Sequence, residues 1–94
     1  MKNLYTFVVE FEGGTYCSQF YEECETGALK LWLTNLYSKK LEIEFDIKCC
    51  ENLNSLLINV EMPSVLDGLK NAWFSYLNLN SNEFYINIVK TELI

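Results

Sequence analysis

Hydrophobic and polar residues alternate near the start of the chain, which is the pattern of a half-buried β-strand. Over residues 4–11 one side carries apolar rings and Val9, whereas the other side is mixed and includes Glu10. Gly13 and Gly14 follow, and we assign to them the positive φ angles of a tight turn. A double glycine also occurs in phosphate-binding loops, but strand-forming residues follow it here, over residues 15–21. The start of the chain is therefore predicted to be a β-hairpin.

Two segments repeat their apolar residues with helical spacing. Over residues 26–37, Leu29, Trp32, Leu33 and Leu36 fall at i, i+3, i+4 and i+7. This stripe predicts a helix that packs on the hairpin. Leu53, Leu56, Leu57 and Val60 repeat the spacing. They predict a shorter helix over residues 51–60, before the single proline, Pro63.

Between these helices, residues 41–48 alternate strictly, with Leu41, Ile43, Phe45 and Ile47 against Glu42, Glu44, Asp46 and Lys48. The pattern favours a strand with one solvated face, although a helix stays open as an alternative. Carboxylates on one face also bind calcium or act as an acid–base pair. No Asp-x-Asp-x-Asp-Gly loop encloses them, however, so a solvated face is the simpler interpretation.

The end of the chain predicts a second hairpin, with strands over residues 72–79 and 84–91 and a turn of four polar residues, 80–83. Residues 64–71 are expected to form a connection. Hairpins that flank helices are typical of an α+β fold. We therefore predict one domain, residues 1–94, with a two-layer architecture: an antiparallel sheet of four or five strands with helices on one face.

The lack of histidine and the excess of acidic residues exclude several classes of function. The 94 residues include no histidine, so the commonest general base and metal ligand is missing. Catalysis is therefore not expected. The chain has 13 acidic residues against seven lysines and no arginine, a formal charge of −6. This charge repels phosphate backbones, which excludes direct nucleic-acid binding from the prediction.

The four cysteines, Cys17, Cys24, Cys49 and Cys50, lack a CxxC spacing, so we expect free thiols and no metal or cofactor. Cys24, near a helix start, would be the nucleophile if one existed. The longest apolar runs are three residues, which predicts no membrane span. No signal-peptide core is present at the start, and a cytoplasmic location is expected.

The acidic residues are unevenly placed: five precede residue 26, five lie between Glu42 and Glu61, and three follow. Solubility explains a negative charge in general, and acids near a helix start favour its dipole. Three carboxylates in four positions nevertheless exceed what a helix start requires. We therefore predict a partner-binding surface made of two sets of side chains: Glu22, Glu23 and Glu25, and Glu42, Glu44 and Asp46.

The segment Phe11-Glu12-Gly13-Gly14-Thr15-Tyr16, with Gly27 to Trp32 after it, resembles part of the HicB-type antitoxins. The likeness covers about 30 residues. In that family the segment belongs to a sheet that resembles RNase H or double-stranded-RNA-binding domains and that neutralises a small basic RNase. The Leu-Pro-Gly-Cys stretch and the DNA-binding tail of the family are missing, so the resemblance implies toxin binding without a repressor function.

The whole chain is similar to a short bacterial α+β family with no settled activity. The shared features are Tyr5 with Phe7, Gly13 to Tyr16, Asp67 to Trp73, and Asn87 to Thr91. Small acidic domains of this kind are similar to immunity proteins of bacterial toxin systems. That resemblance implies a protein partner without identifying it.

These observations predict a small acidic binding module, an immunity protein or antitoxin that covers a basic toxin. The alternative is a self-associating structural or regulatory domain without catalytic activity, including a homodimer. That alternative places self-association at an edge strand of the last hairpin, which offers more apolar surface than one face of a small core absorbs: Trp73, Phe74, Tyr76, Phe84, Tyr85 and Ile86. A hairpin that lies centrally in the sheet, buried by a helix, stays open beside it.

Overall fold

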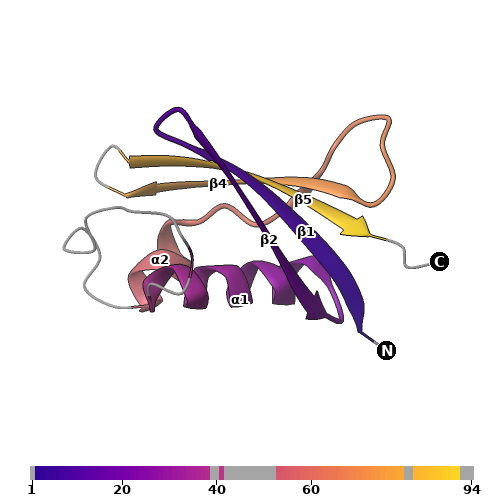
Figure 1. Ribbon diagram of the computed structural model, residues 1–94, viewed down its shortest axis with the longest axis horizontal. Helices are drawn as coiled ribbons and strands as arrows, with labels where there is room; N and C mark the ends of the chain where they lie inside the picture. Colours follow the sequence, from indigo (N-terminus) through magenta and orange to yellow (C-terminus); the bar gives the residue numbers. More distant parts are fainter. Residues whose placement is uncertain (1, 39–40, 42–52, 80–81, 92–94) are drawn as a thin grey trace.

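The computed structural model describes residues 2–38, 41, 53–79 and 82–91. In this part of the chain the structure has five antiparallel strands and two helices, which confirms the α+β class (Figure 1). The elements are β1 (Asn3–Phe11), β2 (Gly14–Glu22), α1 (Glu25–Tyr37), α2 (Leu53–Asn59), β3 (Ser64–Val65), β4 (Ala72–Leu79) and β5 (Asn82–Thr91). The strands lie in the order β2-β1-β5-β4-β3.

The N-terminal hairpin forms as predicted, but its turn lies one residue earlier than expected. Phe11 pairs with Gly14, so the turn consists of Glu12 and Gly13, with φ angles of 48° and 79°. Positive φ at both central positions defines a type I′ turn, whose twist matches that of the two strands. The positive angle assigned to Gly13 is therefore confirmed, whereas the one assigned to Gly14 was wrong, because Gly14 already belongs to β2 and the non-glycine Glu12 adopts the left-handed conformation instead.

The first helix starts one residue before the predicted boundary. Cys24 is its N-cap, with an extended backbone and a thiol that accepts a hydrogen bond from the Gly27 N–H at 3.4 Å. Glu25 lies in the first turn, where a negative charge favours the helix dipole. All four residues of the apolar stripe are buried. The Trp32 ring stacks on Phe7 of β1, with 6.3 Å between ring centroids, so the stripe packs on the hairpin as expected.

Within the described residues the second helix covers Leu53–Asn59 and ends one residue before the predicted boundary, while residues 51–52 of the predicted helix lie outside the described residues. Val60 follows it and forms an isolated bridge with Leu77 of β4. The expected connection over residues 64–71 also contains a strand, since Ser64 pairs with Phe74 and Val65 with Trp73. Strand periodicity is undetectable in two residues, which is why the pattern of the sequence missed β3. The predicted strand over residues 41–48 lies outside the described residues, apart from Leu41.

The C-terminal hairpin also differs from its prediction. β5 begins at Asn82, which pairs with Leu79, so only residues 80–81 connect the strands instead of the four expected. β5 pairs with β1 on one side and with β4 on the other. The hairpin therefore lies inside the sheet, which is the central placement that the sequence left open beside an edge position. Two of its apolar residues, Phe84 and Ile86, are fully buried in the core.

The core gathers alternate residues of the strands against α1 and α2. On the sheet it contains Tyr5, Phe7, Val9, Phe11, Leu77, Leu79, Phe84, Ile86 and Ile88. We call the side of the sheet that carries these residues the core face, and the opposite side the outer face. Phe84 joins the strands to the helix, because its ring stacks on Phe11 at 4.1 Å and meets Trp32 edge-on at 6.1 Å.

Among the described residues, neither helix is long and apolar enough to cross a membrane.

Candidate binding surface

The outer face of the sheet brings together side chains from three strands that are far apart in the sequence. In the ladder, Glu10 of β1 lies opposite Tyr85 of β5, which in turn lies opposite Tyr76 of β4. In the next row of this face, Val8 lies opposite Asn87, and Asn87 lies opposite Phe74. We call the cluster of Glu10, Phe74, Tyr76, Glu83 and Tyr85 the acidic aromatic patch.

Three rings form the apolar part of the patch. The centroids of Tyr76 and Tyr85 are 5.5 Å apart, and those of Phe74 and Tyr85 are 6.5 Å apart. Tyr85 keeps 40% of its surface exposed although it lies in the middle of the sheet. Large aromatic side chains that stay accessible on a sheet face are typical of binding surfaces, because they provide contact area at a small cost in side-chain entropy.

The carboxylate of Glu83 joins two of these rings. Tyr76 donates its hydroxyl hydrogen to Oε1 at 2.7 Å, and Tyr85 donates to Oε2 at 3.0 Å. Asn78 also donates to the Tyr76 hydroxyl oxygen, at 3.3 Å. These contacts set the orientation of the two phenol groups and hold a negative charge between them.

The same hydrogen bonds shift the pKa values of Glu83, Tyr76 and Tyr85. Donation from Tyr76, and then from Tyr85, lowers the pKa of Glu83 from its ordinary value. The hydrogen bond to Glu83 is in turn the main cause that raises the pKa of each tyrosine. Glu83 therefore stays ionised and both tyrosines stay protonated across the neutral range, which keeps the patch negative.

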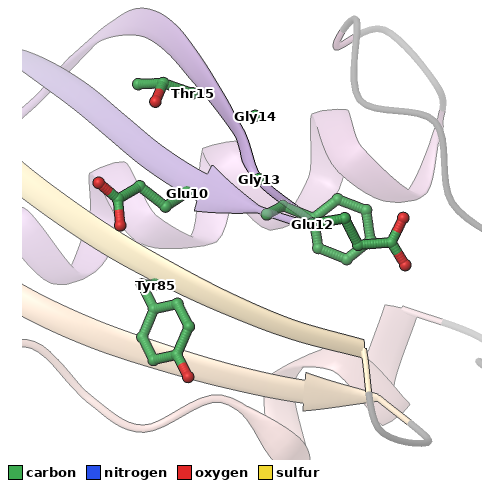
Figure 2. Close-up of a pocket in the computed structure, with 7 residues that line it drawn as sticks. Glu10, Glu12, Gly13, Gly14, Thr15 and Tyr85 are labelled. Carbon is green, nitrogen blue, oxygen red and sulfur yellow. The ribbon is translucent and has the colours of Figure 1, made fainter.

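A shallow hollow of about 330 Å³ borders the patch at the β1–β2 turn. Figure 2 shows Glu10 and Tyr85 on neighbouring strands, together with Glu12 and Gly13 of the turn and Gly14 and Thr15 at the start of β2. The hollow contains the double glycine of the sequence. Two carboxylates line it, however, so an anionic phosphate is repelled there and a cationic group is favoured.

The structure places the first set of predicted site residues at the connection between β2 and α1. We call Glu22, Glu23 and Glu25 the corner cluster. The Glu22 side chain folds back, because its Oε1 accepts the Glu23 N–H at 2.9 Å. Its Cγ lies 2.5 Å from the position that a Cβ on Gly27 would take. Glu23 is exposed and Glu25 is half-buried. Glu22 and Glu25 therefore belong partly to the start of the helix, and Glu23 faces solvent.

The corner cluster and the acidic aromatic patch are separate surfaces. Glu22 pairs with Asn3 at the first residue of β1, whereas Glu10 lies seven positions further along that strand. At the rise of a β-strand this separation is about 23 Å. Glu22 also follows the β2 residues of the core face, whereas Glu10 lies on the outer face. The second predicted set, Glu42, Glu44 and Asp46, lies outside the described residues.

Two of the four cysteines lie in the part of the chain that the structure describes. Cys17 and Cys24 are exposed free thiols. Within the described parts of the chain, no group of three histidine, cysteine, aspartate or glutamate side chains is placed to hold a metal ion. Cys24 caps α1, which gives this residue a structural role. Cys49 and Cys50 lie outside the described residues.

The predicted partner-binding residues include none of this patch, although Phe74, Tyr76 and Tyr85 were named as apolar surface for self-association. The outward position of Glu10 was readable from the alternation of residues 4–11. The contact between Tyr76 and Glu83 was not, because it depends on the register of the C-terminal hairpin and on β5 starting at Asn82. A scan of protein-family models, a search of curated proteins and a search of solved structures each found no match to this chain.

Proposed function

We propose that this protein is a small acidic binding module that neutralises a basic, toxin-like protein by covering it, as an immunity protein or antitoxin does. It acts in the cytoplasm, without catalysis, cofactor, nucleic acid or membrane. The observation that carries the proposal is the acidic aromatic patch, where two carboxylates and three rings share one accessible sheet face. A net charge of −6 gives the whole chain the same preference for a cationic partner.

The proposal includes a two-layer arrangement in which both helices cover the core face and the outer face stays open. Two observations support it. Figure 1 draws α1 and α2 on the same side of the sheet. In addition, the buried residues of β1 are Tyr5, Phe7, Val9 and Phe11, whereas the residues between them are half-buried or exposed. A sheet with one solvated face has this alternation.

Lysine and arginine side chains of the partner fit the chemistry of the patch. A cation over the face of Tyr85 or Phe74 gains about 0.5–2 kcal/mol from the ring, depending on how far it is desolvated. Glu10, which is exposed and lies opposite Tyr85, is placed to pair with the same cation. Glu83 is already oriented by two phenol groups, so little side-chain entropy is lost when a cation approaches it.

The corner cluster has a different role in this proposal. Glu22, where the cluster begins, lies about 23 Å from Glu10 along the sheet, so one basic side chain cannot bridge these two carboxylates. Exposed charges at this distance from an interface act mainly on the rate of association, and salt screens them. We therefore assign tight contacts to the patch and electrostatic steering to the corner cluster, together with Glu42, Glu44 and Asp46.

Capture from native lysate of the source organism at low and at high salt tests the proposal. The wild-type chain is expected to retain a basic protein at low salt and to release it at high salt. Co-expression of the captured protein with and without this chain then measures neutralisation. The proposal is overturned if no basic protein is retained, or if the retained protein is harmless when it is expressed alone.

Two charge-matched variants separate the surfaces. Glu10→Lys with Glu83→Gln changes the patch, whereas Glu23→Lys with Glu25→Gln makes the same change of charge in the corner cluster. The patch variant is expected to lose the partner even at low salt. The corner variant is expected to retain it with slower association. Equal retention by both variants would contradict the assignment of the contacts to the patch.

A further inference from the structure

The two edges of the sheet differ in how they are protected. At one edge, β4 is paired with β3 at Ser64 and Val65, and Val60 bridges to Leu77 near the other end of the strand. At the opposite edge lies β2, which pairs with β1 over nine consecutive residues and with no other strand among the described residues. β2 contains no lysine and no proline, and its register with β1 shows no bulge. Lysine, proline and bulges are the features that natural sheets usually place on an exposed edge strand to prevent pairing with another strand. β2 therefore lacks this protection.

The hairpin geometry identifies which backbone groups this edge presents. Phe11 and Gly14 flank a two-residue turn and thus form a hydrogen-bonded pair, after which bonded and non-bonded pairs alternate along the ladder. The N–H and C=O groups of Tyr16, Ser18 and Phe20 therefore point to β1. Those of the intervening residues, Thr15, Cys17, Gln19 and Tyr21, point away from the sheet.

From this pattern we infer that β2 pairs antiparallel with β2 of a second copy, about a two-fold axis at Ser18. In this register Cys17 lies opposite Gln19 of the other copy, and Thr15 lies opposite Tyr21. Each outward-pointing backbone N–H therefore faces an outward-pointing C=O of the other copy. The four pairs exchange about eight backbone hydrogen bonds. Moving the axis to Cys17 or to Gln19 leaves only about three such pairs.

The side chains of β2 are symmetric about the same residue. Tyr16 and Phe20 stand two positions on either side of Ser18, on the core face, so each ring lies opposite a ring of the other copy. Cross-strand aromatic pairs stabilise a sheet. No charged residue occurs between Gly14 and Tyr21, and Glu22 lies opposite Gly14 of the other copy. Two copies of this edge therefore match in backbone hydrogen bonds and in ring contacts, and no like charges between Gly14 and Tyr21 oppose the pairing.

The dimer does not depend on the proposed partner, and salt distinguishes the two associations. Each copy has a net charge of −6, so distant charges repel two copies and salt screens that repulsion. High salt is expected to strengthen the dimer several-fold, whereas it weakens capture of a basic protein. Loss of one association with retention of the other would thus overturn only one of the two proposals.

Sedimentation of the full chain under reducing conditions, over a range of concentrations, tests the inference. A reversible dimer is expected. Cys17→Pro removes an outward N–H and leaves the bonds to β1 in place, and it is expected to weaken the dimer at least about tenfold. The matched control, Cys17→Ser, keeps the N–H and is expected to dimerise like the wild type. A monomer at all concentrations, in low and in high salt, would overturn the inference.

Cross-linking tests the register independently. In a background with serine at all four native cysteines, Ser18→Cys places two thiols at the two-fold axis, in a non-bonded pair whose Cβ atoms are about 4.5 Å apart. Oxidation is expected to give a covalent dimer with native circular dichroism. Thr15→Cys is the control, because its thiols are about 20 Å apart in this register and stay unlinked. The axis at Ser18 would be contradicted if Thr15→Cys linked as readily as Ser18→Cys, or if neither variant linked. Such results would indicate a β2 dimer with a different register, or a strand of another protein on this edge.

Discussion

The two faces of the sheet use the same strands in different ways. On the core face, Phe7, Val9, Phe84, Ile86 and Ile88 are completely buried. On the outer face, the neighbouring residues of the same strands include Tyr85 and Val89, which keep 40% and 42% of their surface exposed. The rings and carboxylates on the outer face therefore contribute less to folding, and they remain accessible for binding.

Two phenylalanines on opposite faces give the largest expected difference. Phe84 is fully buried between Phe11 and Trp32, so Phe84→Ala is expected to lower the free energy of unfolding by about 3–5 kcal/mol. Phe74 is half-buried on the outer face, and Phe74→Ala is expected to cost about 1 kcal/mol. Urea denaturation measures both values. Similar losses for the two variants would mean that the outer face also belongs to the core.

Val9 and Val8 repeat the comparison within one strand. Val9 is fully buried, and Val9→Ala is expected to cost about 2 kcal/mol, from two methyl groups and the cavity that they leave. Val8 is half-buried on the outer face, and Val8→Ala is expected to cost less than about 1 kcal/mol. The same denaturation experiment applies. A larger loss at Val8 than at Val9 would reverse the assignment of the faces.

In the corner cluster, the Glu22 side chain packs against the start of α1 at Gly27, so this carboxylate affects folding as well as surface charge. A Cβ on Gly27 would stand 2.5 Å from Glu22 Cγ. Replacing a helical glycine by alanine normally gains up to about 1 kcal/mol. Gly27→Ala is therefore expected to gain nothing in the wild type and to gain most of that value in a Glu22→Ala background. Additive effects in this double-mutant cycle would show that Glu22 does not restrict the helix start.

The smallest expected effect is the pH dependence of the tyrosine–carboxylate contact. The lowered pKa of Glu83 means that its contribution is complete above the ordinary value of 4.5 and is lost as pH falls through the lowered pKa. The raised pKa values of Tyr76 and Tyr85 mean that their contribution is complete below 10.0 and is lost as pH rises through them.

Carboxyl carbon shifts in an NMR titration measure the Glu83 midpoint directly. The midpoint is expected to rise toward the ordinary value in the variant Tyr76→Phe with Tyr85→Phe, because both donors are removed. An unchanged Glu83 midpoint in the double variant would exclude the two hydroxyl groups as the cause.

The strands and helices were largely predictable, since each follows a local period. Alternation identified β1, and the spacing of Leu29, Trp32, Leu33 and Leu36 identified α1. Sheet order was not predictable, because nothing local indicates that β5 pairs with β1 instead of lying at an edge. The error in the first turn has a similar origin: two adjacent glycines are chemically equal candidates, and only the Phe11–Gly14 pair decides between them.

The candidate site was less predictable than the fold. Glu22, Glu23 and Glu25 are adjacent in the sequence, and the structure does bring them together at one corner. The acidic aromatic patch joins residues 10, 74, 76, 83 and 85, which meet only through the registers of two strand pairs. A sequence pattern shows which face of its strand a residue occupies, but it does not show which residues lie opposite it on the neighbouring strands. Sites of this kind are therefore identified only from the register of the folded sheet.

Amide shift mapping of the isotopically labelled chain with the captured basic protein tests the central claim most directly. The largest changes are expected on the outer face, at Val8, Glu10, Phe74, Tyr85 and Asn87, while the amides of residues 22–25 and of α1 keep their positions. Changes concentrated at the corner cluster or along α1, with an unchanged outer face, would contradict the account.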